Sequence, residues 1–232
     1  MDSEPSMPDE ETERIMNFSY PYESETRVKS KYTVSELNSR GHEESIVFDP
    51  SVPRAPEKNG LSASHLGTVT HSVLEKMDFG SISCLSEDEG VGRIRDLVSK
   101  MVKEEFLTDE EGEAVEPDKL YGFASCDLGK RIGAAQLRGQ LFREKPFNLR
   151  MKVDGEDALV QGIIDCFFIE DGELVLVDYK TTAPRNVPGI RERYQVQMDI
   201  YRDALMKATG MRVRETYLYL TNMGITVDMD KI

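Results

Sequence analysis

The sequence predicts an α/β protein whose mixed β-sheet is flanked by helices. Three observations support this prediction. Residues 62–135 carry amphipathic helical patterns, residues 141–181 carry the apolar runs of three strands, and residues 191–229 return to a helix and two strands. Helices that precede and follow hairpin-forming strands favour a sheet with both parallel and antiparallel neighbours.

Composition narrows the class of protein. The chain has 232 residues, of which 39% are hydrophobic and 31% charged, which suits one soluble domain with a core and a tail. No apolar run approaches the roughly 20 residues of a membrane helix, and the acidic N-terminus excludes a secretory signal peptide. Three dispersed cysteines without CxxC spacing exclude a zinc ribbon and disfavour a disulfide framework, so a reducing cytoplasm is expected.

The first half of the chain is expected to be an arm followed by helices. Residues 1–60 contain many turn formers and are predicted to be an arm or linker, with residues 61–232 as the folded domain. Ser62 is the predicted cap of the first helix, and an acidic loop is expected at residues 86–90. The predicted helices cover residues 62–79, 91–107, 118–123 and 126–135.

The second half is expected to form most of the sheet. Apolar and alternating runs predict strands, and an amphipathic pattern predicts a helix over residues 191–208 that Gly210 ends. The predicted strands cover residues 141–151, 158–169, 173–181, 213–220 and 225–229.

One predicted hairpin concentrates the acidic chemistry. Asp171 and Gly172 are typical of a two-residue turn, because glycine tolerates the positive φ that such a turn requires. With these two residues as the turn, the numbers of paired residues sum to 343, so Asp165 is expected opposite Asp178. Lys180 lies two residues further along and is expected on the same face.

Two carboxylates on one apolar hairpin repel each other and are poorly solvated. Lys180 offsets one of these charges, and a divalent cation would offset the rest. Oxygen ligands at this spacing suit Mg²⁺ or Mn²⁺. A structural ion pair between Asp165 and Lys180 at a solvated end of the sheet is the alternative interpretation.

The charge of the chain is unevenly distributed. The net charge is −14, and residues 1–119 hold 27 acidic and 13 basic residues, whereas residues 120–232 are balanced. Residues 130–152 carry seven basic residues against one acidic residue. This basic stripe could contact DNA phosphates if it lies on one face, and a solvated charged surface explains it equally well. The candidate DNA-binding residues are Lys130, Arg131, Arg143 and Lys145.

Asp165, followed after twelve residues by Asp178-Tyr179-Lys180, resembles the signature of PD-(D/E)XK nucleases, whose core is restriction-endonuclease-like. The whole run GIIDCFFIEDGELVLVDYKT is similar to the C-terminal nuclease domain of bacterial recombinational-repair helicase–nucleases, the AddA and RecB subunits, and AddA is the closer match. Four further family elements occur here in the family's order: the opening segment at residues 31–37, Gly-x-x-x-His at Gly67 and His71, Glu-x-Pro-Phe at Glu144 and Phe147, and Gln-x-x-x-Tyr at Gln197 and Tyr201.

The resemblance implies roles for these residues. Asp165, Asp178, the Tyr179 carbonyl and His71 would bind the metal, Mg²⁺ with Mn²⁺ as a substitute, and Glu144 would complete a second position or bind through water. Lys180 would orient or help deprotonate the attacking water and stabilise the developing charge. Gln197 and Tyr201 would position Lys180 and the phosphate. Ordinary alternatives are a surface histidine at His71, an ion pair of Glu144 with Arg143 or Lys145, and a core aromatic at Tyr201.

The expected function is Mg²⁺-dependent hydrolysis of DNA, as an exonuclease on single strands unwound during double-strand-break repair. The chain has no phosphate-binding loop of the GxxxxGK[ST] type, so it cannot be the ATP-driven motor. We therefore expect the nuclease portion of a longer helicase–nuclease, with the acidic half facing the helicase portion or an AddB-type partner. Three dispersed cysteines argue against an iron–sulfur cluster. A catalytically silent module that binds DNA or a partner, and an exonuclease that acts alone, are the alternative functions.

Overall fold

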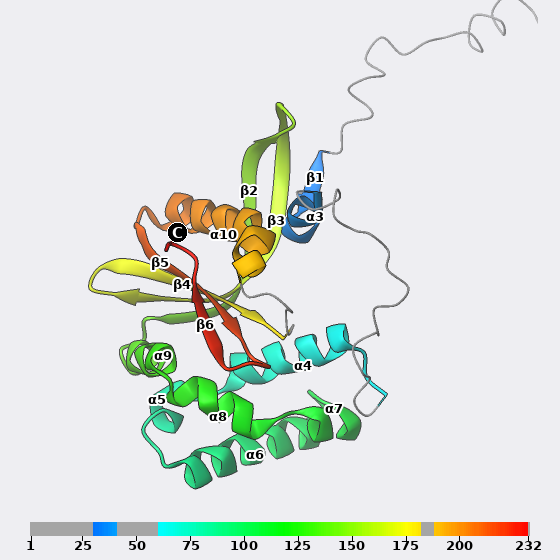
Figure 1. Ribbon diagram of the computed structural model, residues 1–232, viewed down its shortest axis with the longest axis vertical. Helices are drawn as coiled ribbons and strands as arrows, with labels where there is room; N and C mark the ends of the chain where they lie inside the picture. The colour runs from blue at the N-terminus through cyan, green and yellow to red at the C-terminus, as the bar shows by residue number, and fades with distance from the viewer. Residues whose placement is uncertain (1–29, 41–59, 182–187, 232) are drawn as a thin grey trace, which may run out of the picture.

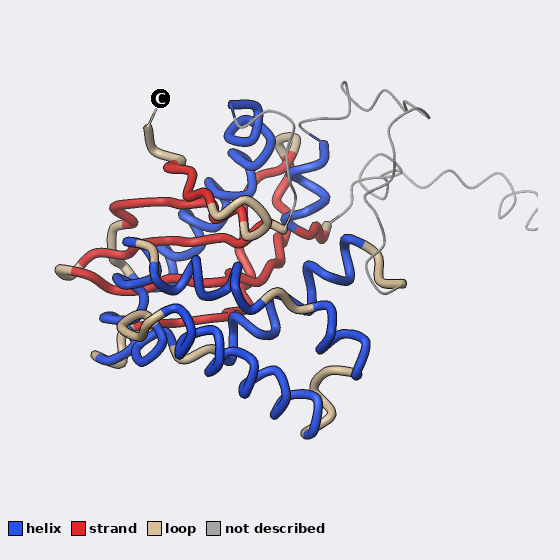
Figure 2. Tube along the Cα trace, turned by 60° about the horizontal axis from the view of Figure 1, so that its bottom comes forward, coloured by secondary structure: helices blue, strands red, loops and turns tan. Residues whose placement is uncertain are grey.

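The computed structural model describes residues 30–40, 60–181 and 188–231, and their strands form one mixed sheet between two layers of helices (Figures 1 and 2). The α/β prediction is therefore confirmed. Among the helices of these residues, none has the length and apolar character that crossing a membrane requires. The strands are β1 (Lys31–Thr33), β2 (Leu141–Val153), β3 (Glu156–Glu170), β4 (Glu173–Lys180), β5 (Val213–Leu220) and β6 (Ile225–Asp228).

The sheet is arranged around β3. Its order is β1-β3-β4-β5-β6, with β2 paired antiparallel along the other edge of β3. β1 is parallel to β3 at residues 159–161, and β4 is antiparallel to β3 at residues 166–170. The two strands share one edge of β3, so among the described strands none pairs with residues 162–165 on that edge. The fold therefore leaves an opening beside Asp165.

Helices cover both faces of the sheet. One layer packs on one apolar core with Cys166, Val177 and Tyr179 of the sheet, and α10 and α3 pack on a second core with Leu176 and Leu218. The first layer contains α4 (Ala63–Lys76), α5 (Phe79–Ile82), α6 (Glu87–Lys103), α7 (Asp109–Ala114), α8 (Pro117–Ser125) and α9 (Asp127–Leu137). The other layer contains α3 (Val34–Arg40) and α10 (Pro188–Thr209).

The predicted hairpin register is confirmed up to its last pair. Asp171 and Gly172 both have positive φ, 53° and 80°, as the two-residue turn requires. Cys166 pairs with Val177, in agreement with the predicted register, but the ladder ends there. The prediction that Asp165 lies directly opposite Asp178 is therefore wrong. The two strands separate one residue earlier, and Asp165 Oδ2 accepts a hydrogen bond from the backbone N–H of Tyr179 at 2.8 Å.

The helix boundaries differ from prediction where side chains cap backbone groups. The predicted acidic loop at residues 86–90 is the first turn of α6, because Ser86 and Glu89 form a capping box and acidic residues favour a helix N-terminus. Ser62 caps α4 as predicted, but α4 ends at Lys76 because Asp78 caps the separate helix α5. A second capping box, at Thr108, begins the unpredicted α7.

Two ordered elements lie within the predicted arm. β1 extends the sheet, and α3 packs against α10. Residues 1–29 and 41–59 lie outside the described residues, so the proposed boundary at residue 60 stays a prediction.

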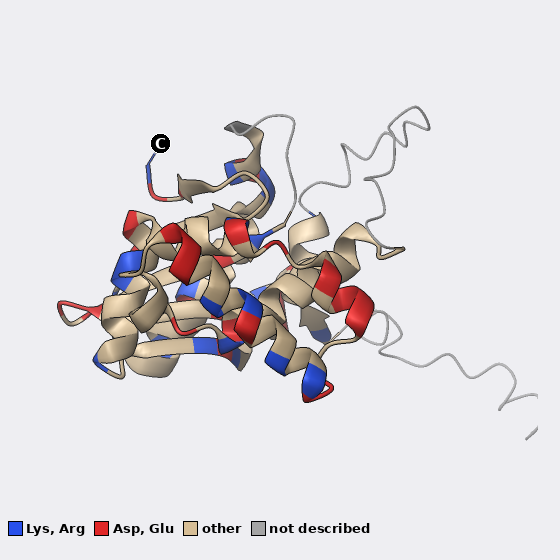
Figure 3. Ribbon diagram, turned by 90° about the horizontal axis from the view of Figure 1, so that it is seen from below, with Lys and Arg blue, Asp and Glu red and all other residues tan. Residues whose placement is uncertain are grey.

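The predicted basic stripe is divided among different surroundings. Acidic and basic residues are interspersed along the layer that contains α4 to α9 (Figure 3). The Arg131 guanidinium on α9 lies 2.6 Å from carboxylate oxygens of both Glu170 and Glu215, and Arg214 also pairs with Glu170. Hydrogen bonds from Glu170, together with that of Glu215, raise the pKa of Arg131 despite partial burial. Arg131 therefore links α9 to the ends of β3 and β5.

We predict that Arg131→Leu lowers the free energy of unfolding by about 1 kcal/mol, because the two carboxylates lose a shared cation. Thermal unfolding would measure this loss. Retention of single-stranded DNA on a filter should change less than twofold. Weakened DNA retention without a change in stability would instead support the predicted DNA contact.

Candidate active site

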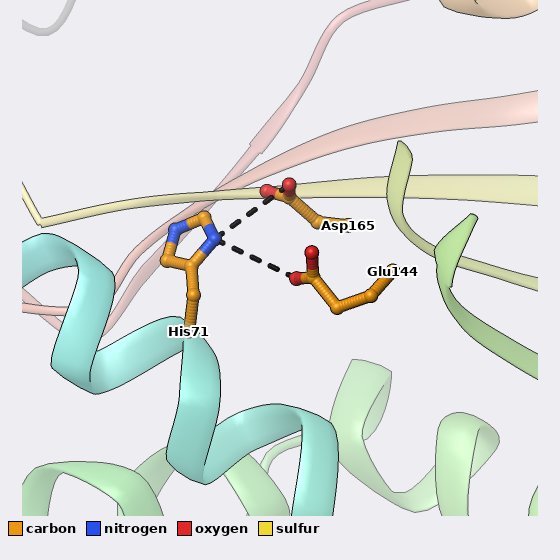
Figure 4. Close-up of side chains that lie close together, drawn as sticks. All are labelled: His71, Glu144 and Asp165. Atoms are coloured by element: carbon orange, nitrogen blue, oxygen red, sulfur yellow. Dashed lines mark ion pairs between the residues drawn. The ribbon is translucent and has the colours of Figure 1, made fainter. Parts of the chain in front are cut away.

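A histidine and two carboxylates converge where β3 and β4 separate (Figure 4). His71 extends from α4, and its Nδ1 lies 3.6 Å from Asp165 Oδ1 and 3.9 Å from Glu144 Oε1. Its Nε2 lies 3.1 Å from the carbonyl oxygen of Tyr179. A carbonyl oxygen can only accept a hydrogen bond, so this contact requires the proton on Nε2 and leaves the Nδ1 lone pair toward the carboxylates.

Glu144 reaches this cluster through the pairing of β2 with β3. Arg143 pairs with Cys166 and Lys145 with Ile164, so Glu144 lies across from Asp165. Its φ is 47°, an uncommon value for a residue with a side chain. Strained backbone of this kind persists where surrounding structure holds it and is often found at functional sites. The strand pairing therefore brings Glu144 to the site, rather than an ion pair with its neighbours.

The second carboxylate of the signature is held from α10. Asp178 is buried, with 1% of its side chain exposed, and its Oδ2 lies 2.6 Å from Lys180 Nζ. Gln197 Nε2 donates to Asp178 Oδ1 at 2.8 Å and to the Tyr201 hydroxyl at 3.0 Å. Lys180 Nζ also lies 4.9 Å from the ring centroid of Tyr194. Gln197 and Tyr201 thus meet at Asp178, as their four-residue spacing allows.

The electrostatics of the site favour a bound cation. Burial, and then the charge of Asp178, raise the pKa of Asp165 well above its ordinary value. Burial also raises the pKa of Glu144, helped by Glu75 and Asp178. Desolvation lowers the pKa of His71, which keeps its imidazole neutral and able to ligate.

Ligand atoms of His71, Glu144 and Asp165 all lie within 4.8 Å of one another. Carboxylate oxygens with one imidazole are a donor set that suits a divalent cation. The residues present therefore fit a metal of the kind that the sequence predicted.

Two residues bring α4 close to the sheet. A Cβ at Gly67 would lie 3.1 Å from Thr181 Oγ1, tighter than ordinary van der Waals contact, so only glycine fits easily one turn before His71. Arg143 donates from Nη1 to the carbonyl oxygens of Leu74 and Met77, at the C-terminal end of α4. Arg143 therefore ties α4 to β2, a role that its charge alone did not suggest.

The site opens into a pocket of about 430 Å³. It is lined by one face of α4, by Glu144 and by the end of β4. Glu75, which the sequence motifs did not single out, lines this pocket one turn after His71. Its four-residue spacing from His71 is the sequence signal that could have identified it. Of the candidate DNA-binding residues, Lys130 and Lys145 are exposed but are not part of the pocket lining.

The model of the PD-(D/E)XK nuclease superfamily matches residues 50–230. The chain therefore belongs to this superfamily, and the resemblance seen in its motifs is confirmed.

The chain is similar to proteins described as the A-type subunit of an ATP-dependent helicase/nuclease. It is 35% identical to that of Clostridium beijerinckii over 232 residues, covering 90% of this chain and 18% of the relative. It is 36% identical to that of Acetivibrio thermocellus over 242 residues, covering 94% and 18%, and 35% identical to that of Thermoanaerobacter pseudethanolicus over 233 residues, covering 90% and 18%. The chain spans less than a fifth of the length of these relatives.

We predict that Asp165→Asn raises the melting temperature of the metal-free chain by about 2–4 °C at pH 8, because it removes a buried charge beside Asp178. Folding raises the pKa of Asp165, so its charged form destabilises the fold as pH rises above the ordinary carboxyl pKa. The gain should therefore shrink at pH 5.

Scanning calorimetry in EDTA at both pH values tests this prediction. Asp157→Asn, in an exposed part of the same strand, is the matched control and should change the melting temperature little. A lower melting temperature for Asp165→Asn at pH 8 would contradict the electrostatic interpretation.

We also predict that Gly67→Val weakens Mn²⁺ binding by about tenfold or more, because displacement of α4 carries His71 away from the carboxylates. Titration calorimetry would measure the affinity. Gly92→Val on α6 is the control, since nothing lies within 4 Å of a Cβ placed there. Equal Mn²⁺ affinity in both variants would show that the close approach of α4 is unimportant.

Proposed function

We propose that this chain is the nuclease domain of a helicase–nuclease and hydrolyses phosphodiester bonds in single-stranded DNA with a bound divalent cation. The observation that carries the proposal is the convergence of His71, Glu144 and Asp165 beside the Asp178–Lys180 pair. Mg²⁺ is the proposed cation, with Mn²⁺ as a substitute, because both accept carboxylate oxygen ligands.

His71, Glu144, Asp165 and Asp178 would hold the cation, and the carbonyl oxygen of Tyr179 is at hand because it contacts His71. A cation bound there would polarise the scissile phosphate and lower the pKa of a bound water. The protein supplies the remaining positioning through Lys180 and the α10 residues that surround it.

Lys180 is proposed to act as a fixed cation. Burial alone would lower its pKa, but the charges of Asp178 and Asp165 raise it overall, so the ammonium stays protonated. A protonated Lys180 would orient the attacking water and stabilise charge that develops on the phosphate. This favours orientation over proton abstraction, one of the two roles expected for this residue. Gln197 and Tyr201 would hold Asp178 and thereby Lys180.

The names of the relatives support a wider proposal. The chain would work beside a helicase portion and an AddB-type partner protein in the cytoplasm, as an exonuclease on strands unwound during double-strand-break repair. Residues 61–232 would form the nuclease domain and residues 1–60 the connecting arm. Exposed Lys130 and Lys145 are the proposed phosphate contacts of the basic stripe, because Arg131 and Arg143 are engaged in structural interactions.

We predict that the purified chain degrades labelled single-stranded DNA with Mg²⁺ and not with EDTA. Lys180→Ala should lower the rate about 100-fold, because a preorganised charge that stabilises the transition state is lost. Gel electrophoresis of the products measures the rate. Lys100→Ala, an exposed lysine on α6, is the control and should cut normally.

The outcomes separate the possible functions. Cutting that survives Lys180→Ala would contradict the proposed site. Mg²⁺ binding without cutting would indicate a nuclease that needs its helicase to deliver the strand. A chain that neither cuts DNA nor binds Mg²⁺ would be the catalytically silent module.

A further inference from the structure

Asn38 connects the predicted arm to the candidate active site. It lies in α3, outside the residues matched by the superfamily model, and only 9% of it is exposed. Its side-chain Oδ1 accepts a hydrogen bond from the backbone N–H of Gln197 at 3.2 Å. That N–H lies inside α10, where amides ordinarily bond only to the carbonyl four residues back. The contact therefore fixes α3 to the turn of α10 that carries Gln197.

The same turn of α10 holds the buried carboxylate of the signature. Gln197 Nε2 donates to Asp178 Oδ1 at 2.8 Å, and Asp178 Oδ2 lies 2.6 Å from Lys180 Nζ. A continuous series of buried contacts thus runs from Asn38 through Gln197 to Asp178 and Lys180. Because hydrogen bonds weaken steeply with distance and angle, a small displacement of this turn would loosen Asp178.

The helix that carries Asn38 is held to the strand that carries Asp165. β1 pairs with β3 directly before α3 begins. Val34 is buried so close to β3 that a Cβ at Gly162 would lie 2.8 Å from it. At the other end of α3, Arg40 pairs with Asp154 of the β2–β3 turn at 3.0 Å. Asn38 therefore sets the position of α10 relative to β3.

We infer that Asn38 is a positioning residue for the metal site, acting through Gln197 to hold Asp178 in place relative to Asp165. The inference rests on the proposed function for its catalytic consequence, but it also concerns metal affinity, which can be measured without DNA. It makes α3 a working part of the site.

The test uses the full 232-residue chain. Asn38→Leu removes the acceptor oxygen at nearly constant shape, and Asn38→Asp keeps an acceptor oxygen. Ser39→Ala is the control, because the Ser39 hydroxyl bonds only to the Ser35 carbonyl of the same helix among the described contacts. Gln197→Met removes the link to Asp178, alone and combined with Asn38→Leu. Mn²⁺ affinity by calorimetry, and kcat and KM on single-stranded DNA, are measured for each variant.

The expected result is a three- to tenfold loss of Mn²⁺ affinity and of kcat for Asn38→Leu, with KM for DNA within twofold of the original chain. Asn38→Asp should recover most of the loss, and Ser39→Ala should show none. In the Gln197→Met background, Asn38→Leu should cause no further loss, because the two residues act in series.

Losses that multiply in the double variant would overturn the inference, as would unchanged Mn²⁺ affinity in Asn38→Leu or failure of Mn²⁺ to bind the original chain. Mn²⁺ binding that responds to Asn38 as expected, in a chain that cuts no DNA, would support the positioning role while overturning the proposed nuclease activity.

Discussion

The carboxylates of Asp165, Asp178 and Glu144 crowd into the space that opens where the pairing of β3 and β4 ends. Their mutual repulsion in a desolvated place raises the pKa values of Asp165 and Glu144, and only Lys180 offsets it within the site. An arrangement of this kind is costly in the free chain, and a divalent cation would relieve that cost. The rest of the structure serves to hold these groups in place against their repulsion.

Both apolar cores contribute to that support. α4 belongs to the layer on one face of the sheet, where Gly67 allows it to approach Thr181 and Arg143 bonds its last carbonyls. α10 belongs to the opposite layer and holds Asp178 through Gln197. The site is therefore assembled from elements that pack independently, and their relative placement depends on the sheet between them.

Local sequence signals were reliable where one short segment decides the structure. The Asp171–Gly172 turn set the register of the hairpin as far as Cys166, and the cap at Ser62 was recognised. Capping boxes at Ser86 and Thr108 were missed, because acidic residues before a helix resemble a polar loop in composition. The motifs also identified the superfamily, since their residues follow one another in its order.

The sequence by itself determined the elements, the hairpin turn and the residue types of the site, because these follow from short-range patterns of polarity and backbone preference. Only the tertiary structure decided that the ladder ends before Asp165, that Glu144 faces it from β2, and that Arg143 and Arg131 are engaged in structural contacts. It also decided that Asn38 contacts Gln197. The physical reason is that each of these contacts joins residues distant in the chain, whose meeting depends on the packing of both helical layers around one sheet.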